Sequence, residues 1–129
     1  MDTKELKTPY YIFYADEFIL NYKNLKESMQ AVYEDYQIAY SFKTNYTPVV
    51  CNLVKKLGGY AEVVSDMEYK LALKVGFSSD HIIYNGPGKG EMLEQCLLNG
   101  GIHNVDNMRE LEKVCDIAKN NPQKEIGIG

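Results

Sequence analysis

The sequence predicts an α/β protein built as part of a (β/α)8 barrel of the TIM type. Short apolar stretches that read as strands begin near residues 38, 60, 82, 103 and 125, at intervals of about 22 residues. Each of the first four is followed by an amphipathic helical segment, which gives about five strand–helix units with parallel strands and right-handed crossovers. An open doubly wound sheet shares this pattern, and the evenness of the repeat favours the barrel.

Composition places the chain among ordinary single-domain proteins. It has 129 residues, 45% of them hydrophobic, and a net charge of −4 with a pI near 5.2. An acidic chain is a poor ligand for nucleic acid or an anionic membrane, and neither a signal peptide nor a membrane-spanning run is visible. Cys51, Cys96 and Cys115 fall in predicted helices without metal-ligand spacing. We therefore expect a cytoplasmic protein with reduced thiols and no metal.

The N-terminal part reads as one strand and one helix. Residues 10–14, which follow Thr8-Pro9, are almost wholly aromatic or β-branched and predict a strand buried on both faces. Asp16 is expected to cap a helix. Its apolar stripe comprises Phe18, Ile19, Tyr22, Leu25, Met29, Val32 and Tyr33. We assign residues 1–15 to a strand segment and residues 16–129 to the barrel.

The stretch 38–45 combines a short strand with a lysine at its end. Alternation separates its side chains into two sets, with Ile38, Tyr40 and Phe42 on one face and Ala39, Ser41 and Lys43 on the other. The bulky face suits packing on helices, and the small and cationic face suits a site inside a barrel. Taken alone, the octapeptide also fits a lysine that ends a strand and points to water.

Helix signals follow each strand. Thr47-Pro48 marks a helix start and Gly58-Gly59 its end, and Ser65-x-x-Glu68 is a capping box for a helix that stops at Gly76. The expected strands are 60–64, 82–84, 102–105 and 126–129, and further helices cover 92–97 and 108–118. The loop 85–90 lacks the spacing of a dinucleotide or P-loop motif and reads as a plain strand-to-helix turn. His81 and His103 read as loop or surface residues.

Glu62 is unusual because it is a carboxylate inside a short apolar strand, where an unpaired charge is costly. If its face is the barrel interior, Glu62 lies on the strand next to the one that presents Lys43. An inward ion pair between the two would then explain both residues. The alternative is an irregular strand with Glu62 facing solvent, and Glu68 is explained structurally by the capping box.

Together these residues resemble the N-terminal part of the barrel-type, pyridoxal-phosphate-dependent amino-acid decarboxylases, which include the diaminopimelate, ornithine and arginine decarboxylases and share their barrel with alanine racemase. Residues 8–13 resemble the opening strand of that family. Residues 40–45 resemble its Y-A-V-K-A-N block, and residues 62–68 its D-V-V-S-x-x-E block. Residues 81–89 and 105–111 resemble two later blocks in the same order.

The resemblance implies a function and a site. Lys43 matches the lysine that forms the Schiff base with pyridoxal 5'-phosphate, and Glu62 and Glu68 match carboxylates that hold and orient that lysine and its cofactor surroundings. The implied reaction is decarboxylation of a basic or diamino acid, diaminopimelate or else ornithine, lysine or arginine. The implied assembly is a homodimer, with residues 1–15 joined to a C-terminal β-domain.

Two residues depart from the family pattern. Glu62 stands where the family usually has aspartate, and Gly129 falls where an arginine commonly follows the fifth strand. The phosphate loop and the partner of the pyridine nitrogen come later in the family than residue 129. The chain therefore reads as an incomplete N-terminal portion of the enzyme. The alternative is a non-catalytic, truncated relative that acts as a binding or regulatory partner.

Overall fold

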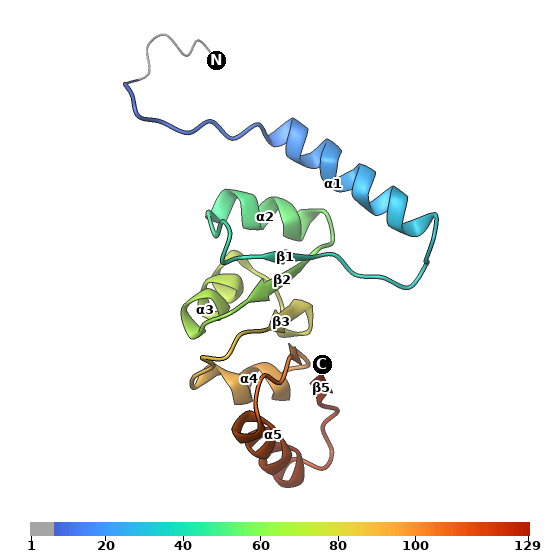
Figure 1. The fold of residues 1–129 in the computed structure, drawn as a ribbon, viewed down its shortest axis with the longest axis vertical. Helices are drawn as coiled ribbons and strands as arrows, with labels where there is room; N and C mark the ends of the chain where they lie inside the picture. The colour runs from blue at the N-terminus through green and yellow to red at the C-terminus, as the bar shows by residue number, and fades with distance from the viewer. Residues whose placement is uncertain (1–6) are drawn as a thin grey trace. The chain divides into compact units, whose positions relative to one another are not determined.

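The computed structural model describes residues 7–129, so residues 1–6 of the predicted segment 1–15 lie outside the described part. The chain forms two compact units, one that ends at Tyr36 and one that runs from Gln37 to Gly129. The second unit contains the parallel sheet and the helices that alternate with its strands (Figure 1).

The second unit repeats strand and helix along its length. Its elements are β1 (Ala39–Ser41), α2 (Pro48–Lys56), β2 (Tyr60–Val63), α3 (Asp66–Val75), the 3-10 turn η2 (Ser79–His81), β3 (Ile82–Tyr84), α4 (Met92–Leu98), β4 (Ile102–His103), α5 (Met108–Asn120) and β5 (Gly127–Ile128). All neighbouring strands pair in parallel, in the order β1-β2-β3-β4-β5. Sheet order follows chain order without reversal, as in an arc of a barrel and unlike a doubly wound sheet. The predicted fold class is confirmed.

One face of the sheet is the main core. Val63, Tyr84 and His103 lie side by side in the register of β2, β3 and β4, and all are fully buried. The ring of Tyr84 stacks on Tyr69 of α3, with ring centroids 5.8 Å apart. This face therefore packs on helices. The opposite face, which includes Glu62, is only half-buried.

Sequence signals set the ends of the helices. Pro48 occupies the first turn of α2 after Thr47, although the Thr47 side chain makes no capping hydrogen bond. Ser65 caps α3 and accepts a hydrogen bond from the Glu68 backbone N–H at 3.2 Å. Gly76 ends α3 with φ of 97°, a left-handed conformation that glycine adopts without a Cβ clash. These three boundaries are as predicted.

The first unit corrects two expectations. Residues 10–14 form no strand, and their side chains are exposed. A strand needs a neighbour to satisfy its backbone N–H and C=O groups, and the described residues place none beside this segment. Helix α1 (Ala15–Gln30) begins one residue before Asp16, so Asp16 lies in its first turn and Tyr14 is the residue that precedes the helix.

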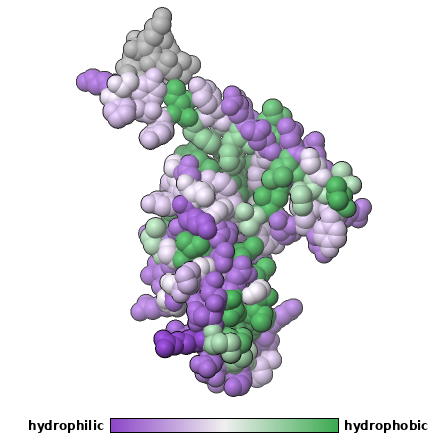
Figure 2. Space-filling view, in the orientation of Figure 1, coloured by the Kyte–Doolittle hydropathy of each residue, from purple (hydrophilic) through white to green (hydrophobic). Residues whose placement is uncertain are grey.

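Helix α1 keeps much of its apolar stripe exposed. Tyr22 is its only buried residue. Hydrophobic side chains show at the surface in Figure 2, and the exposed apolar residues of the first unit include Leu20, Leu25 and Met29. None of the helices formed by residues 7–129 is long and apolar enough to cross a membrane.

Candidate active site

The polar residues of the site lie at or just past the carboxyl ends of β1, β2 and β3. Parallel strands end at one edge, which is where barrel enzymes place their active sites. Lys43 lies in the turn directly after β1 and is exposed. Thr44 closes this turn, because its backbone N–H and its hydroxyl both donate to the Ser41 carbonyl oxygen, at 3.2 and 2.7 Å. The turn therefore carries Lys43 on a fixed backbone.

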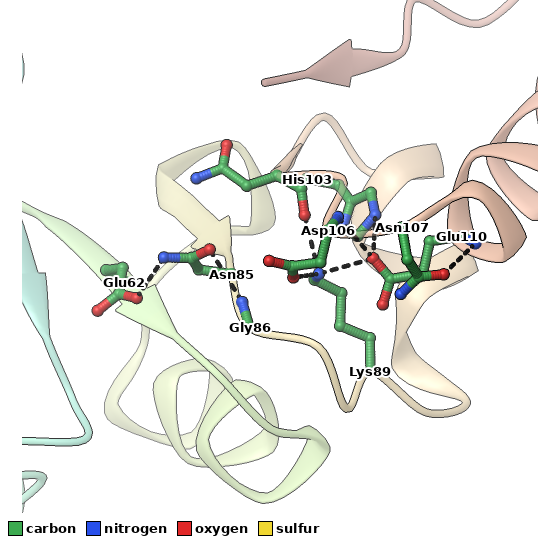
Figure 3. A network of polar contacts seen from close by, with 9 residues as sticks. Glu62, Asn85, Gly86, Lys89, His103, Asp106, Asn107 and Glu110 are labelled. Atoms are coloured by element: carbon green, nitrogen blue, oxygen red, sulfur yellow. Dashed lines mark hydrogen bonds and ion pairs between the residues drawn. The ribbon is translucent and has the colours of Figure 1, made fainter.

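Glu62 lies on β2 directly opposite Ser41 of β1. Both oxygens of its carboxylate are engaged. The Ser41 hydroxyl donates to Oε2. The Asn85 side-chain amide donates to Oε1 at 3.1 Å, as Figure 3 shows. A negatively charged side chain in a half-buried strand is thereby satisfied by two neutral donors.

The predicted ion pair between Lys43 and Glu62 is wrong. No ion pair between residues 7–129 involves Lys43. Two physical reasons explain the difference. Ser41 and Asn85 already occupy the Glu62 carboxylate, and β1 ends at Ser41, so Lys43 no longer follows the alternation of the strand. The two predicted residues are on adjacent elements at one edge of the sheet, without direct contact.

Glu68 is nearly fully buried in the first turn of α3. Its Oε2 accepts a hydrogen bond from the Val64 backbone N–H at 2.8 Å, and its own N–H donates to Ser65. The capping box is confirmed, although the carboxylate bonds the residue before the cap rather than Ser65 itself. Glu68 therefore fixes the backbone at Val64, which directly follows β2 and lies two residues after Glu62.

A second polar cluster lies beside the first and was missed from the sequence. The Lys89 side chain is fully buried, and its ammonium donates to Asp106 Oδ2 at 2.7 Å, to Glu110 Oε2 at 3.1 Å and to the Asn104 carbonyl at 2.8 Å (Figure 3). The loop 85–90 is thus a strand-to-helix connection, as predicted, whose lysine is anchored within the protein.

The sequence did carry a signal for the acidic half of this cluster. Asn107 caps α5 and accepts from the Glu110 backbone N–H at 3.0 Å, while the Glu110 carboxylate accepts from the Asp106 N–H at 3.0 Å. This is the arrangement of Ser65 and Glu68 repeated two strand–helix units later. The spacing Asn-x-x-Glu marks it, because asparagine caps helices as well as serine does.

The two histidines differ from each other. His81 lies in the exposed turn η2, with Nδ1 3.0 Å from Asp80 Oδ1, as predicted. The prediction for His103 is wrong, because it lies on β4 and is fully buried. Burial and the nearby Lys89 ammonium lower the pKa of His103, so its ring is neutral at neutral pH. Neither ring nitrogen has a hydrogen-bond partner among the described residues, and Nε2 lies 3.8 Å from Glu110 Oε2.

Gly129 follows β5 at the same edge of the sheet. A Cβ built on Gly129 would collide with the side-chain oxygen of Asn104. The Asn104 carboxamide thus fills the space that a longer residue at 129 would need. The Asn104 side chain thus lies where this chain departs from the family pattern, with glycine at position 129 in place of an arginine.

Other chemistries have little support. The described residues contain no group of three or more His, Cys, Asp or Glu side chains placed to bind a metal ion. Burial raises the pKa of Cys51 to about 11 and that of Cys96 to about 12, so neither thiol ionises readily to act as a nucleophile. Lys43 is the amine at the carboxyl edge that remains accessible.

A parallel sheet whose strand order follows the chain, with helices alternating with its strands, defines the class of protein as a barrel-type α/β protein. Comparison with known families identifies the family within this class. The profile of the "Pyridoxal-dependent decarboxylase, pyridoxal binding domain" matches residues 17–128. The chain belongs to this family, whose cofactor is pyridoxal phosphate.

Individual relatives agree with the family. The chain is 34% identical over 113 residues to the diaminopimelate decarboxylase of Aquifex aeolicus, covering 86% of the chain and 26% of the relative. It is 29% identical over 129 residues to the L-glutamyl-[BtrI acyl-carrier protein] decarboxylase of Niallia circulans, covering 98% of the chain and 29% of the relative. The chain therefore spans less than a third of either relative.

The fold is also that of a solved enzyme. The crystal structure of diaminopimelate decarboxylase from Helicobacter pylori complexed with L-lysine superposes with a TM-score of 0.79 and 28% identity, over 97% of this chain and 32% of that one. The agreement covers the described sheet and helices. It identifies the five parallel strands and the helices between them as part of a decarboxylase barrel.

Proposed function

We propose that this chain is the cofactor-binding portion of a pyridoxal-phosphate-dependent amino-acid decarboxylase and that Lys43 is the residue that attaches the cofactor. The observation that carries the proposal is the position of Lys43, exposed in a turn at the carboxyl edge of the sheet, one strand from a carboxylate held in place by two donors. When bound, pyridoxal phosphate supplies an electron sink that lets the α-carboxylate leave as carbon dioxide.

Lys43, Glu62 and Glu68 would each have a different role in holding the cofactor. The Lys43 amine is a primary amine free of ion pairs among the described residues, so it can react with an aldehyde once it has lost its proton. Glu62, held by Ser41 and Asn85, would supply a negative charge to the cofactor site. Glu68 would support the site indirectly, since its carboxylate accepts the backbone N–H of Val64, two residues after Glu62. The Lys43 amine would also be able to transfer a proton when it is not attached to the cofactor.

The substrate proposal is a basic or diamino acid, with diaminopimelate first and ornithine, lysine or arginine next. Its support is the two diaminopimelate decarboxylases named above, of which the chain spans less than a third. We propose further that the whole enzyme is a cytoplasmic homodimer and that residues 1–15 join its β-domain. The exposed aromatic side chains of residues 10–14 support that role, because a neighbouring strand would cover them.

The role of Lys43 is tested by trapping. The chain is loaded with pyridoxal phosphate and reduced with borohydride, and the adduct is mapped by peptide mass spectrometry. We expect the adduct at Lys43, its loss in Lys43→Ala, and no change in Lys70→Ala, which removes an exposed lysine on α3. An adduct at another lysine would refute the assignment. A folded chain that takes no adduct would favour the non-catalytic alternative.

A further inference from the structure

Three polar side chains form a line across three adjacent strands. Ser41 ends β1, Glu62 lies opposite it on β2, and Asn85 directly follows β3. The Ser41 hydroxyl and the Asn85 amide donate to different oxygens of the Glu62 carboxylate, so Glu62 is held from both sides (Figure 3 shows the Asn85 side). One donor at the end of β1 and one just past β3 therefore hold the two carboxylate oxygens.

Asn85 is itself fixed. Its backbone N–H donates to the Val63 carbonyl at 2.8 Å, and its side-chain oxygen accepts from the Gly86 N–H at 2.9 Å. The carboxamide can therefore present only its NH₂ group to Glu62. Asn85 is therefore a hydrogen-bond donor in a fixed position for one oxygen of the Glu62 carboxylate.

Ser41 has contacts in two directions. Its hydroxyl reaches Glu62, and its carbonyl oxygen accepts both hydrogen bonds that close the turn carrying Lys43. One residue thus connects the carboxylate to the lysine turn.

The two contacting residues also differ together from the motif blocks they resemble. Ser41 stands at the alanine of Y-A-V-K-A-N, and Glu62 stands at the aspartate of D-V-V-S-x-x-E. Alanine has no hydroxyl to donate, and aspartate has a side chain one bond shorter. The longer carboxylate and the added hydroxyl meet across the β1–β2 register.

We propose that Ser41 is a positioning residue of the cofactor site, which acts through Glu62 with Asn85 as the second support. This inference rests on the proposed function of Lys43 and adds a residue to it. Ser41 keeps the Glu62 carboxylate and the Lys43 turn at a constant separation. The side chain of an aspartate at position 62 would be one bond shorter and would keep its position without a hydroxyl at position 41.

The test is a double-mutant cycle in the 129-residue chain with two readouts. Ser41→Ala, Glu62→Asp and the double variant are compared for thermal unfolding without cofactor and for the rate of pyridoxal phosphate attachment to Lys43, trapped by borohydride. We expect Ser41→Ala to slow attachment about tenfold, the size of one hydrogen bond to a charged group. In the Glu62→Asp background the same change should have almost no effect on either readout.

Two further variants complete the design. Ser41→Thr keeps a hydroxyl and should restore most of the attachment rate. Ser28→Ala removes a hydroxyl that bonds only the Asn24 carbonyl of its own helix, and should leave the rate unchanged. A merely structural role would lower the unfolding temperature in Ser41→Ala without a matching change in attachment rate.

The outcomes separate this inference from the proposed function. Additive effects of Ser41→Ala and Glu62→Asp on unfolding would overturn the inference, and so would coupled unfolding with an unchanged attachment rate. Both results leave the Lys43 assignment standing if the wild-type chain is labelled there. A wild-type chain that is not labelled at Lys43 overturns the proposed function and the positioning role together.

Discussion

The single buried charge of Lys89 connects three segments of the chain. Its side chain has no exposed surface, yet it contacts the loop after β4 and the first turn of α5 from the loop that precedes α4. Glu110 is nearly as buried, and Asp106 is partly exposed. A buried cation is tolerated because two carboxylates and a carbonyl surround its ammonium group.

We predict that Lys89→Met lowers the free energy of unfolding by about 3–5 kcal/mol, because it leaves a carboxylate buried without its partner. Lys119→Met is the matched control. Lys119 pairs with Asp116 at 3.6 Å, and both side chains are exposed, so this change should cost less than about 1 kcal/mol. Urea unfolding followed by circular dichroism measures both. Equal losses in the two variants would show that burial does not set the strength of the Lys89 cluster.

At the scale of elements, Asp66 connects α3 to α4. It lies at the first position of α3, and its carboxylate accepts hydrogen bonds from the backbone N–H groups of Gly90, Glu91 and Met92, at 3.3, 2.9 and 3.3 Å. The Tyr84 hydroxyl donates to the same group at 2.6 Å. A residue of one helix thus caps the next, which has no capping side chain of its own.

This cap makes stability depend on pH. Burial acts to raise the pKa of Asp66, but the hydrogen bonds from Tyr84 and from the α4 N-terminus outweigh it and hold the pKa below its ordinary value. Because folding lowers this pKa, the ionised carboxylate stabilises the folded state at pH values above the unfolded pKa of about 4. That contribution is lost as the pH falls further, through the pKa of the folded state.

We predict that Asp66→Asn lowers the free energy of unfolding by about 1 kcal/mol at neutral pH, because asparagine lacks the negative charge that favours the N-terminus of α4 and strengthens these hydrogen bonds. The difference from wild type should shrink as the pH falls below about 4, because the wild-type carboxyl then takes up a proton. Urea titrations from neutral to acidic pH measure it. Asp35→Asn, at an exposed residue, is the control. A difference that stays constant down to the lowest pH would contradict the assigned cause.

At the scale of the molecule, the sheet has two edges. β1 pairs only with β2, and β5 pairs only with β4, in the sheet that the described residues form. Ile128 of β5 is 55% exposed. Unpaired strand edges with apolar side chains are sites of association between chains.

We predict that residues 1–129, expressed by themselves, associate with increasing concentration and that Ile128→Lys reduces this association. A lysine on an edge strand opposes pairing with another chain. Val49→Lys is the control, since it places the same charge at an exposed apolar position on α2. Sedimentation velocity over a range of concentrations measures the effect. Equal reduction by both variants would indicate general charge repulsion rather than pairing at β5.

Much of the fold could be predicted because its signals are local. The even period of strands and helices predicts the sheet order, and Ser65, Glu68 and Gly76 mark the ends of α3 as the structure has them. Residues 10–14 show the limit. Their aromatic and β-branched composition is typical of a strand, yet a strand forms only where another strand supplies hydrogen bonds.

The site divides in the same way. The sequence by itself determined the family, a lysine near the end of the first strand of the sheet and the carboxylate on β2, because motif blocks depend on neighbours in the chain. Only the tertiary structure decided which groups meet. It gave Glu62 the partners Ser41 and Asn85, 21 and 23 residues away, in place of Lys43, and it buried Lys89 against Asp106 and Glu110. Such contacts depend on strand register and on where each strand ends, and a shift of one residue in either would change every partner.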